Sequence, residues 1–454
     1  RRDDGRIVVE TPAGSFEDES PVAHQERAGG RSSVPVAFAL EGTTCRFELG
    51  EYDPSLPLVI DPAVLIYAGY IGGAADDRGS AIARDAAGNV YITGSTESVG
   101  FPVDVGPDLT FNSVIQAPDA FVAKVNADGT ELVYCGYIGG GQADAGTGIA
   151  VDGAGNAYVA GWTRSTNFPV RVGPGLTYHG GNSQFSEAFV AKVNASGEEL
   201  VYSGFIGGTS DDEAAGIAVD GAGNAYVTGW TRSNDLSRTV GPDLSFNGGL
   251  DAFVSKVNAA GTGFVYSGYL GGTADDFGAA VAVDGQGRAV VAGGANSRPS
   301  ENFPVLTGPS LTHSGGQEGF VARVAAGGAA LEYCGYIGGS GDDLCAAVAL
   351  DAAGAAYVAG ATASRYQFPA VVGPDLSFNG GIDAFAAKVP PSGAGLSYCG
   401  YIGGSGEDQA TAVAVDAAGI AYVAGYTDSA SGFPVSGGPE LIPSGYRDAF
   451  LVTV

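Results

Sequence analysis

The chain is poor in the residues on which many enzymes and metal sites depend. Its 454 residues include only three His and five Cys, and no Met at all. None of the cysteines forms a Cys-x-x-Cys pair, which excludes a zinc site of the usual cysteine spacing, and their odd number argues against a disulfide framework. Because the chain lacks Met and begins Arg1-Arg2-Asp3, we interpret it as a processed or trimmed product.

Basic residues and long apolar runs are also scarce. Lys and Arg number 21 against 50 Asp and Glu, which gives a formal net charge of −29. Nucleic acids and anionic membrane surfaces recruit clustered Lys and Arg, so we expect neither as a partner. No apolar run approaches the ~18 residues of a membrane-spanning helix, so we expect no membrane insertion. The composition is typical of a large, acidic, exported protein.

The dominant feature of the sequence is a repeat of about 66 residues that occurs six times. Each copy opens with a string such as YIGGAADD, and the six strings start at Tyr70, Tyr137, Phe205, Tyr269, Tyr336 and Tyr401. Apolar runs of four to seven residues follow, joined by Asp-x-x-Gly and Asn-x-x-Gly turns that suit β-hairpins. Helical periodicity is absent. Four antiparallel strands repeated in this way predict the blades of a β-propeller.

The repeat count and the two ends of the repeat region predict how the ring closes. We expect an all-β fold, with a six-bladed propeller of four-stranded blades in residues 61–454. The last copy ends in its third strand at Val454, whereas residues 64–70 (VLIYAGY) resemble a fourth strand that has no blade of its own. We therefore expect residues 64–70 to complete the last blade and cover its edge.

Residues 1–60 lie outside the repeats and predict a small, truncated N-terminal β domain. Four strands are expected in it, near residues 7–10, 21–25, 34–40 and 45–49. So small a sheet supports a small core at best and leaves an edge unpaired. We therefore consider self-assembly through this region into filaments or a surface layer. The alternative is that it packs on its own propeller as a lid.

The motif series GGSGDD, AVDxxGNAYVTG, FP and DAFVAKV is similar to the SBBP-type β-propeller repeats of bacterial exported proteins. The resemblance covers residues 61–454 and implies the propeller fold, although that family is named for seven blades and six are counted here. Residues 5–62 resemble the C-terminal part of the β-rich domain that often precedes these repeats. The resemblance implies a fold and leaves the biochemical role open.

Eleven carboxylates recur in the GGxxDD strings, where we expect them to ring the mouth of the central channel. Like charges so placed need compensation, and calcium is a cation that prefers oxygen ligands. In the alternative interpretation each Asp accepts bonds from backbone N–H groups of its own glycine-rich crossing. The predicted calcium ligands are Asp76, Asp77, Asp144, Asp211, Asp212, Asp275, Asp276, Asp342, Asp343, Glu407 and Asp408.

The long loops between the second and third strands are the other candidate site. Their aromatic residues Phe111, Tyr178, Phe246 and Phe378 are either platforms for a ligand or plugs between blades. Residues that break the repeat symmetry are the better indicators of a ligand surface. They are Trp162 and Trp230 after the second strand, and Tyr178, His179 and His313 in the loops.

No nucleophile or acid–base set emerges from these residues. We expect a non-enzymatic extracellular or cell-surface scaffold or adhesion protein, with a glycan, a surface protein or further copies of itself as partners. The alternative is a carbohydrate-binding or carbohydrate-active propeller that acts from its loop face. Such an enzyme needs two carboxylates, one of them with a raised pKa, and the surplus of acids leaves such a pair open.

Overall fold

The computed structural model describes residues 7–11, 14–18, 22–27, 30–41, 44–56, 58–61, 68–113, 117–181, 183–237, 239–435 and 446–454. The chain forms two compact units, of which the first comprises Arg1–Gly69 and the second holds the repeats from Tyr70 onward. No helix in the described ranges is long and apolar enough to span a bilayer.

The N-terminal unit is built from seven short strands in three small sheets. The strands are β1 (Ile7–Thr11), β2 (Gly14–Asp18), β3 (Val22–Arg27), β4 (Gly30–Val34), β5 (Val36–Glu41), β6 (Thr44–Leu49) and β7 (Leu58–Asp61). The sheets pair β1 with β2, β5 with β6, and β3 with both β4 and β7. All four expected strands are present, and β2, β4 and β7 are additional.

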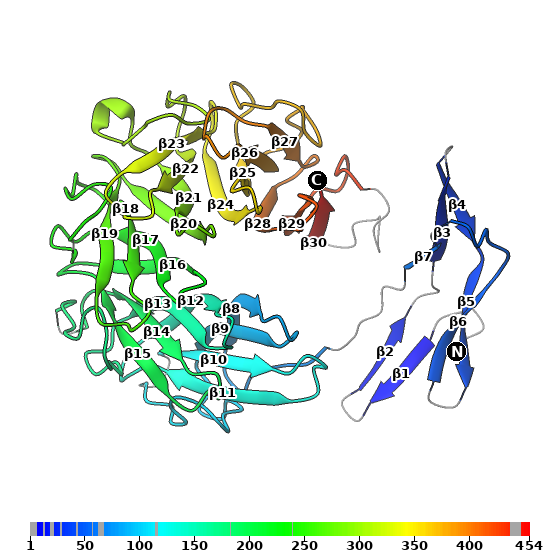
Figure 1. The fold of residues 1–454 in the computed structure, drawn as a ribbon, viewed down its shortest axis with the longest axis horizontal. Coiled ribbons are helices and arrows are strands. Elements are labelled where there is room, and N and C mark those ends of the chain that lie inside the picture. Colours follow the sequence, from blue (N-terminus) through cyan, green and yellow to red (C-terminus); the bar gives the residue numbers. More distant parts are fainter. Residues whose placement is uncertain are drawn as a thin grey trace. The chain divides into compact units, whose positions relative to one another are not determined.

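The second unit, which holds the six repeats, is a six-bladed β-propeller, and this confirms the predicted fold (Figure 1). Five of its sheets have four described strands, labelled a to d in chain order and paired in that order, and the sixth has strands a, b and c. The a strands are β8 (Asp77–Arg84), β12 (Asp144–Val151), β16 (Asp212–Val219), β20 (Asp276–Val283), β24 (Asp343–Leu350) and β28 (Asp408–Val415). The b strands are β9 (Val90–Thr96), β13 (Ala157–Thr163), β17 (Ala225–Thr231), β21 (Ala289–Ala295), β25 (Ala356–Thr362) and β29 (Ala421–Thr427).

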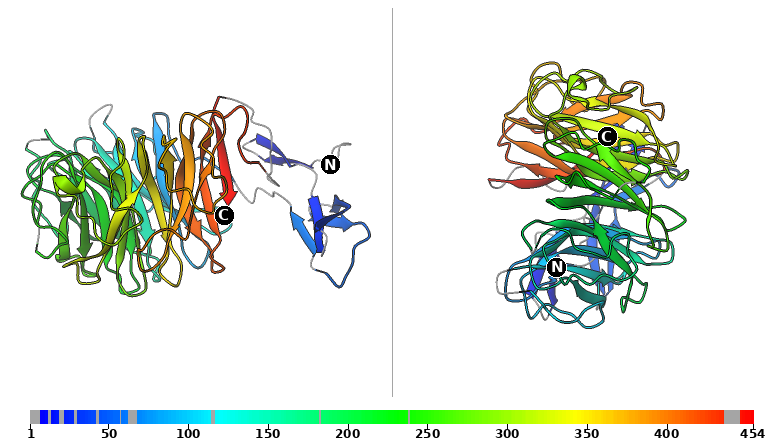
Figure 2. Two further views of the ribbon diagram at one scale, coloured as in Figure 1. Left: turned by 90° about the horizontal axis from the view of Figure 1, so that it is seen from above. Right: turned by 90° about the vertical axis from the view of Figure 1, so that its left-hand side faces the viewer.

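The outer half of each blade continues in the same order. The c strands are β10 (Asp119–Val125), β14 (Glu187–Val193), β18 (Asp251–Val257), β22 (Glu318–Val324), β26 (Asp383–Val389) and β30 (Asp448–Thr453). The d strands are β11 (Leu132–Ile138), β15 (Leu200–Ile206), β19 (Phe264–Leu270), β23 (Leu331–Ile337) and β27 (Tyr398–Ile402). The views in Figure 2 show the sheets of this unit standing next to one another.

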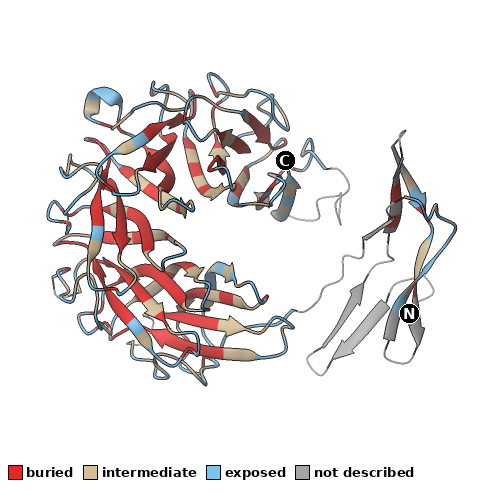
Figure 3. Cartoon of the chain, in the orientation of Figure 1, coloured by how far each residue is buried: buried red, intermediate tan, exposed pale blue. Residues whose placement is uncertain are grey.

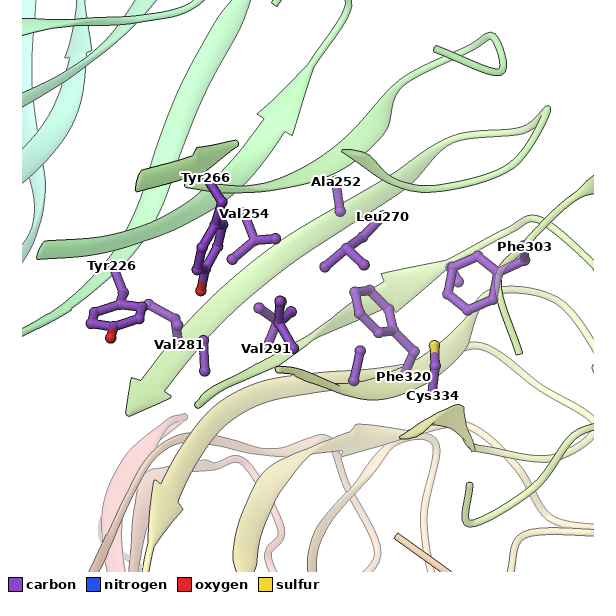
Figure 4. Close-up of a cluster of buried hydrophobic side chains, with 14 of the residues drawn as sticks. Tyr226, Ala252, Val254, Tyr266, Leu270, Val281, Val291, Phe303, Phe320 and Cys334 are labelled. Carbon is purple, nitrogen blue, oxygen red and sulfur yellow. The ribbon is translucent and has the colours of Figure 1, made fainter. Parts of the chain in front are cut away.

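The hydrophobic core of the propeller lies between neighbouring blades. One cluster joins Tyr266 and Leu270 of the third blade to Phe303 and Phe320 of the fourth (Figure 4). Burial is accordingly concentrated in the strands, and the loops carry the exposed residues (Figure 3). Each blade is therefore stabilised mainly by its neighbours, as expected of a repeat architecture.

At the end of the propeller that carries the hairpin between strands a and b, a tyrosine hydroxyl of four blades contacts a carbonyl oxygen of the next blade. We call this contact the latch. The Tyr158 hydroxyl lies 3.0 Å from Asp152 Oδ2 in its own hairpin and 3.2 Å from the carbonyl oxygen of Gly223 in the next blade. Lys192 Nζ lies 3.4 Å from Asp152 Oδ2 and 4.7 Å from the Tyr158 ring centroid. The same latch joins Tyr91 to Gly155, Tyr226 to Gly287 and Tyr357 to Gly419.

The fourth blade makes the equivalent connection with a different residue. Val290 stands where the other blades have Tyr, and fully buried Arg323 stands where the first, second, third and fifth blades have Lys. The Arg323 guanidinium donates to the carbonyl oxygens of Gly354 and, at 2.7 Å, of Pro391. Gly354 lies in the first hairpin of the next blade and Pro391 in its second. One arginine thus replaces the Tyr–Lys pair.

The seam between the sixth and first blades is more open than the other seams. The sixth sheet has three strands among the described residues. Tyr422 is 38% exposed although its counterpart Tyr158 is fully buried, and Ile82 is 70% exposed against 7% for Ile149. The predicted closing strand at residues 64–70 lies mostly outside the described residues, and Ala68–Tyr70 form no strand. That part of the prediction stays a prediction.

If residues 64–70 close the ring, a disulfide should form between Ala68→Cys and Val452→Cys in a Cys45→Ser background. These positions correspond to Cys135 and Ala123, which face each other in β11 and β10. The Cys135 N–H donates away from β10, to the carbonyl oxygen of Val105, so the pair is of the close, non-hydrogen-bonded type. We expect faster migration on non-reducing gels and a Tm several degrees higher. Ala68→Cys with Leu451→Cys, which points to the other face, is the control, and equal bonding in both would contradict the register.

Replacement of Arg323 by Lys should destabilise the chain by about 2 kcal/mol, because a single ammonium cannot replace the two guanidinium N–H groups that bind two carbonyl oxygens. The double variant Val290→Tyr/Arg323→Lys restores the latch residues of the other blades and should recover most of that loss. Chemical denaturation of the three proteins measures the difference. No recovery in the double variant would contradict the equivalence of the two latches.

Candidate functional site

The second acid of each GGxxDD string opens strand a, and it is buried in the second to sixth blades and half-buried, as Asp77, in the first. Asp144 Oδ2 accepts bonds from the Gly140 N–H at 2.7 Å and from Ser165 Oγ at 2.9 Å. Equivalent glycine bonds of 2.7–2.8 Å hold Asp77, Asp212, Asp276, Asp343 and Asp408. These contacts confirm the alternative interpretation, in which each aspartate fixes its own crossing.

The first acid of each string behaves differently. Asp76, Asp275, Asp342 and Glu407 are exposed, and Asp211 is half-buried. Two of these carboxylates cap backbone N–H groups: Asp211 accepts from Ser186 and Asp342 from Gln317, each at 2.9 Å. Within the described ranges, no three His, Cys, Asp or Glu side chains gather as a potential metal site. The predicted calcium ligands are therefore not brought together, and calcium binding stays a prediction.

A buried carboxyl pair occupies each of the five described blade seams. The acid that opens strand c of one blade meets the aspartate that opens strand a of the next. A methyl group on Gly139 would lie 2.6 Å from Asp119 Oδ1 and 2.9 Å from Asp144 Oδ2, so only glycine fits between them. The other pairs are Glu187 with Asp212, Asp251 with Asp276, Glu318 with Asp343, and Asp383 with Asp408.

Burial raises the pKa values of the acids in the first three seams. It raises the pKa of Asp144 to about 7 and that of Glu187 to about 8, and the partner carboxylate in each pair adds to the shift. The side chains of both pairs are fully buried, so a substrate cannot reach them. Carboxylates with raised pKa values do occur in pairs here, but these pairs do not form an accessible glycosidase site.

The long loops cap the strand-c acids. The backbone N–H of His179 donates to Glu187 Oε2 at 2.7 Å, and Asn112, Asn247 and Asn379 cap Asp119, Asp251 and Asp383 in the same way. The His179 side chain is half-exposed, with Nδ1 3.5 Å from Glu187 Oε1. Loop conformation is thus coupled to the seam carboxylates.

The loop aromatics pack inward against strand d. Phe111, Tyr178, Phe246 and Phe378 lie with ring centroids 5.7–5.9 Å from Tyr137, Phe205, Tyr269 and Tyr401. His313 takes the same place in the fourth blade, 5.4 Å from Tyr336, and burial lowers its pKa. Each of these rings packs against strand d of its own blade, and a ligand surface on these loops stays a prediction.

The four described cysteines offer no reactive thiol. Cys135, Cys334, Cys345 and Cys399 are buried and unbridged. Burial raises the pKa of Cys135 to about 12, and the same cause raises the others. A thiol that stays protonated at neutral pH is a poor nucleophile.

The two tryptophans differ in their surroundings. Trp162 lies within β13, whereas the sequence predicted it after that strand. It lines a cavity of about 250 Å³ at the seam of the first and second blades. The other lining residues are Asp76, Arg78, Ser95, Glu97, Pro118 and Ala145. Trp230 lies opposite Glu213 one blade further on and does not line this cavity. Of the predicted ligand surface, only Trp162 lines it.

Sequence reasoning missed Arg78, Ser95 and Glu97 as members of this site. A signal existed, because these positions differ from copy to copy. Trp162 stands at the position that Ser95, Trp230, Gly294, Ala361 and Tyr426 occupy elsewhere, and Arg78 at the position of Ala145, Glu213, Phe277, Leu344 and Gln409. The positions that hold the fold, by contrast, are nearly invariant among the blades.

Comparison with known proteins supports the repeat assignment. The family model for the SBBP β-propeller repeat matches residues 66–102, 134–169 and 203–237, and a domain of unknown function, DUF7948, matches residues 1–63. The chain is 28% identical over 176 residues to the regulatory protein FlaEY of Caulobacter vibrioides. That alignment covers 39% of this chain and only 17% of FlaEY.

Solved structures are similar to the chain at low identity. A protein of unknown function from Dyadobacter fermentans is 14% identical, with a TM-score of 0.38, over 84% of this chain and 96% of its own. Sqt1 of Chaetomium thermophilum is 11% identical, with a TM-score of 0.37, over 78% of this chain and 82% of its own.

The seam carboxyl pairs predict stability that falls as pH rises. Because burial raises the folded-state pKa of Asp144 and Asp251 to about 7 and of Glu187 to about 8, the folded chain holds more protons than the unfolded chain near pH 6. For each such proton, the free energy of unfolding falls by about 1.4 kcal/mol per pH unit as the pH rises. We expect a higher Tm at pH 5 than at pH 8.5. Asp251→Asn should flatten the profile, whereas exposed Asp128→Asn should not, and a Tm that rises with pH would contradict the assignment.

Proposed function

The chain carries SBBP β-propeller repeats behind a domain of unknown function, and from this premise we propose that it is a non-enzymatic scaffold or adhesion protein that acts outside the cell. Propellers host many unrelated functions, so the fold alone does not decide. One observation carries the proposal. The residue types that hold the fold are the same in nearly all blades, whereas those at the positions of Arg78, Glu97 and Trp162 differ from blade to blade.

That contrast separates structural residues from recognition residues. The strand-a aspartates and their glycine partners recur in all six blades, and the latch or its Arg323 substitute occurs in five. At the position of Glu97, the other blades have Arg164, Arg232, Asn296, Ala363 and Asp428. A rigid frame with a varied rim suits binding to another molecule better than repetition of one chemical step.

The described side chains also argue against catalysis. The thiols are buried and protonated, and the carboxyl pairs with raised pKa values are sealed inside the seams. His179 and His313 lie in different blades, and neither contacts a Ser or Cys nucleophile in a hydrogen bond of the described residues. Recognition without chemistry is the simplest function for these sites.

Self-assembly is the second part of the proposal. The N-terminal unit consists of sheets of only two or three strands among its described residues. Such sheets leave edges that accept a strand from another chain, and a head-to-tail contact that does not close propagates as a filament. We propose this unit as the contact through which copies of the chain assemble.

Localisation and assembly can be tested on cells that produce the protein. An antibody against the full chain should label intact cells, and external protease should remove the signal. Electron microscopy of the concentrated protein should show filaments or sheets. Labelling that appears only after lysis would overturn the extracellular role, and dispersed single particles at all concentrations would overturn assembly.

A further inference from the structure

We propose that the cavity between the first and second blades binds one sugar ring of a glycan, stacked on the indole of Trp162. This proposal rests on the recognition role proposed above and specifies its ligand. The cavity offers one aromatic wall and one polar wall, each supplied by a different blade.

The second blade supplies the aromatic wall. Trp162 is half-buried in β13, between Ala145 on β12 and Ala188 on β14. Because both cross-strand partners are alanines, neither of them covers the indole. The Arg164 guanidinium lies 6.0 Å from the Trp162 ring centroid and steadies the indole by a cation–π contact. The C–H face of a pyranose stacks on such a surface.

The first blade supplies the polar wall. Arg78 and Ser95 face each other across β8 and β9, and the backbone N–H of Glu97 donates to the Asp76 carbonyl oxygen at 2.9 Å. The wall therefore presents guanidinium donors, a hydroxyl and two carboxylates within one small cavity. Sugar hydroxyl groups both donate and accept hydrogen bonds, so they can satisfy acceptors and donors side by side.

Size and charge favour a sugar over other ligands. A cavity of about 250 Å³ is smaller than the ~300–1,000 Å³ typical of drug-sized ligands and suits a single ring of a longer chain. A cationic side chain would meet Arg78 as well as the acids, and a purely apolar ligand would form no hydrogen bond with Arg78, Asp76 or Glu97. A hydroxylated ring with one apolar face meets neither cost.

The equivalent seams lack this combination. Beside Trp230, Glu213 is half-buried and already accepts a bond from Ser186 Oγ at 3.1 Å. In the fourth blade, Phe277 covers Gly294, which stands where Trp162 stands. These two seams therefore lack the site, and Trp230 provides a matched control.

The test begins with a glycan array that carries neutral, N-acetylated and uronic-acid glycans, probed with the labelled full chain. The strongest binder is then titrated against the protein, and the fluorescence of its two tryptophans is followed. We expect Trp162→Ala to weaken binding at least tenfold, Trp162→Phe to retain most of it, and Arg78→Met to weaken it. Trp230→Phe should bind as the unmodified chain does, and thermal melts check that all variants fold.

Three results would overturn the sugar site. They are silence of the whole array, equal binding by Trp162→Ala and the unmodified chain, or quenching of Trp162 by a lysine-rich peptide but by no glycan. None of them removes the proposed scaffold role, because cell-surface labelling and filament formation are measured without a glycan. Failure of those measurements, in turn, would leave the array result standing.

Discussion

Five of the six blades carry a buried aspartate at the first position of strand a, which ties the blade to the crossing from the blade before it. The desolvation of that carboxylate is costly, and it is offset only because Gly140 and Ser165, or their counterparts, deliver donors to one oxygen of the group. The crossing between blades must therefore fold tightly around the side chain. The glycines of the GGxxDD string follow from that requirement, as does the closeness of the next acid across the seam.

The two ends of the propeller obey different constraints. At the hairpin end, the Tyr, Asp and Lys side chains of one blade converge on a carbonyl oxygen of the next, which leaves little freedom for substitution. Burial opposes ionisation of Asp152, but the bonds from Asn156 and Tyr158 outweigh it and lower its pKa. At the opposite end, Trp162 and Arg78 make no such contacts to the next blade's backbone, so these positions can change without loss of the fold.

Much of this architecture could be predicted from the sequence because its causes are local. Four consecutive residues, from Asp152 to Gly155, determine the hairpin between the first two strands of the second blade. Gly155 adopts the left-handed φ of 82° that such a turn needs. The carboxyl pairs could not be predicted, because Asp119 and Asp144 belong to different blades and meet only after both have folded. The cavity at Trp162 likewise combines five separate segments. In the N-terminal unit, β2 and β4 are polar and lack the apolar alternation that reveals a strand.

The position of the cores between blades, rather than within them, makes the propeller a chain of nearest-neighbour couplings. Loss of one blade removes contacts from two interfaces, whereas loss of a terminal blade removes contacts from one. The sixth blade, with Tyr422 partly exposed, is coupled strongly on only one side among the described residues. Unfolding should accordingly start at this seam and proceed blade by blade from the two blades that border it.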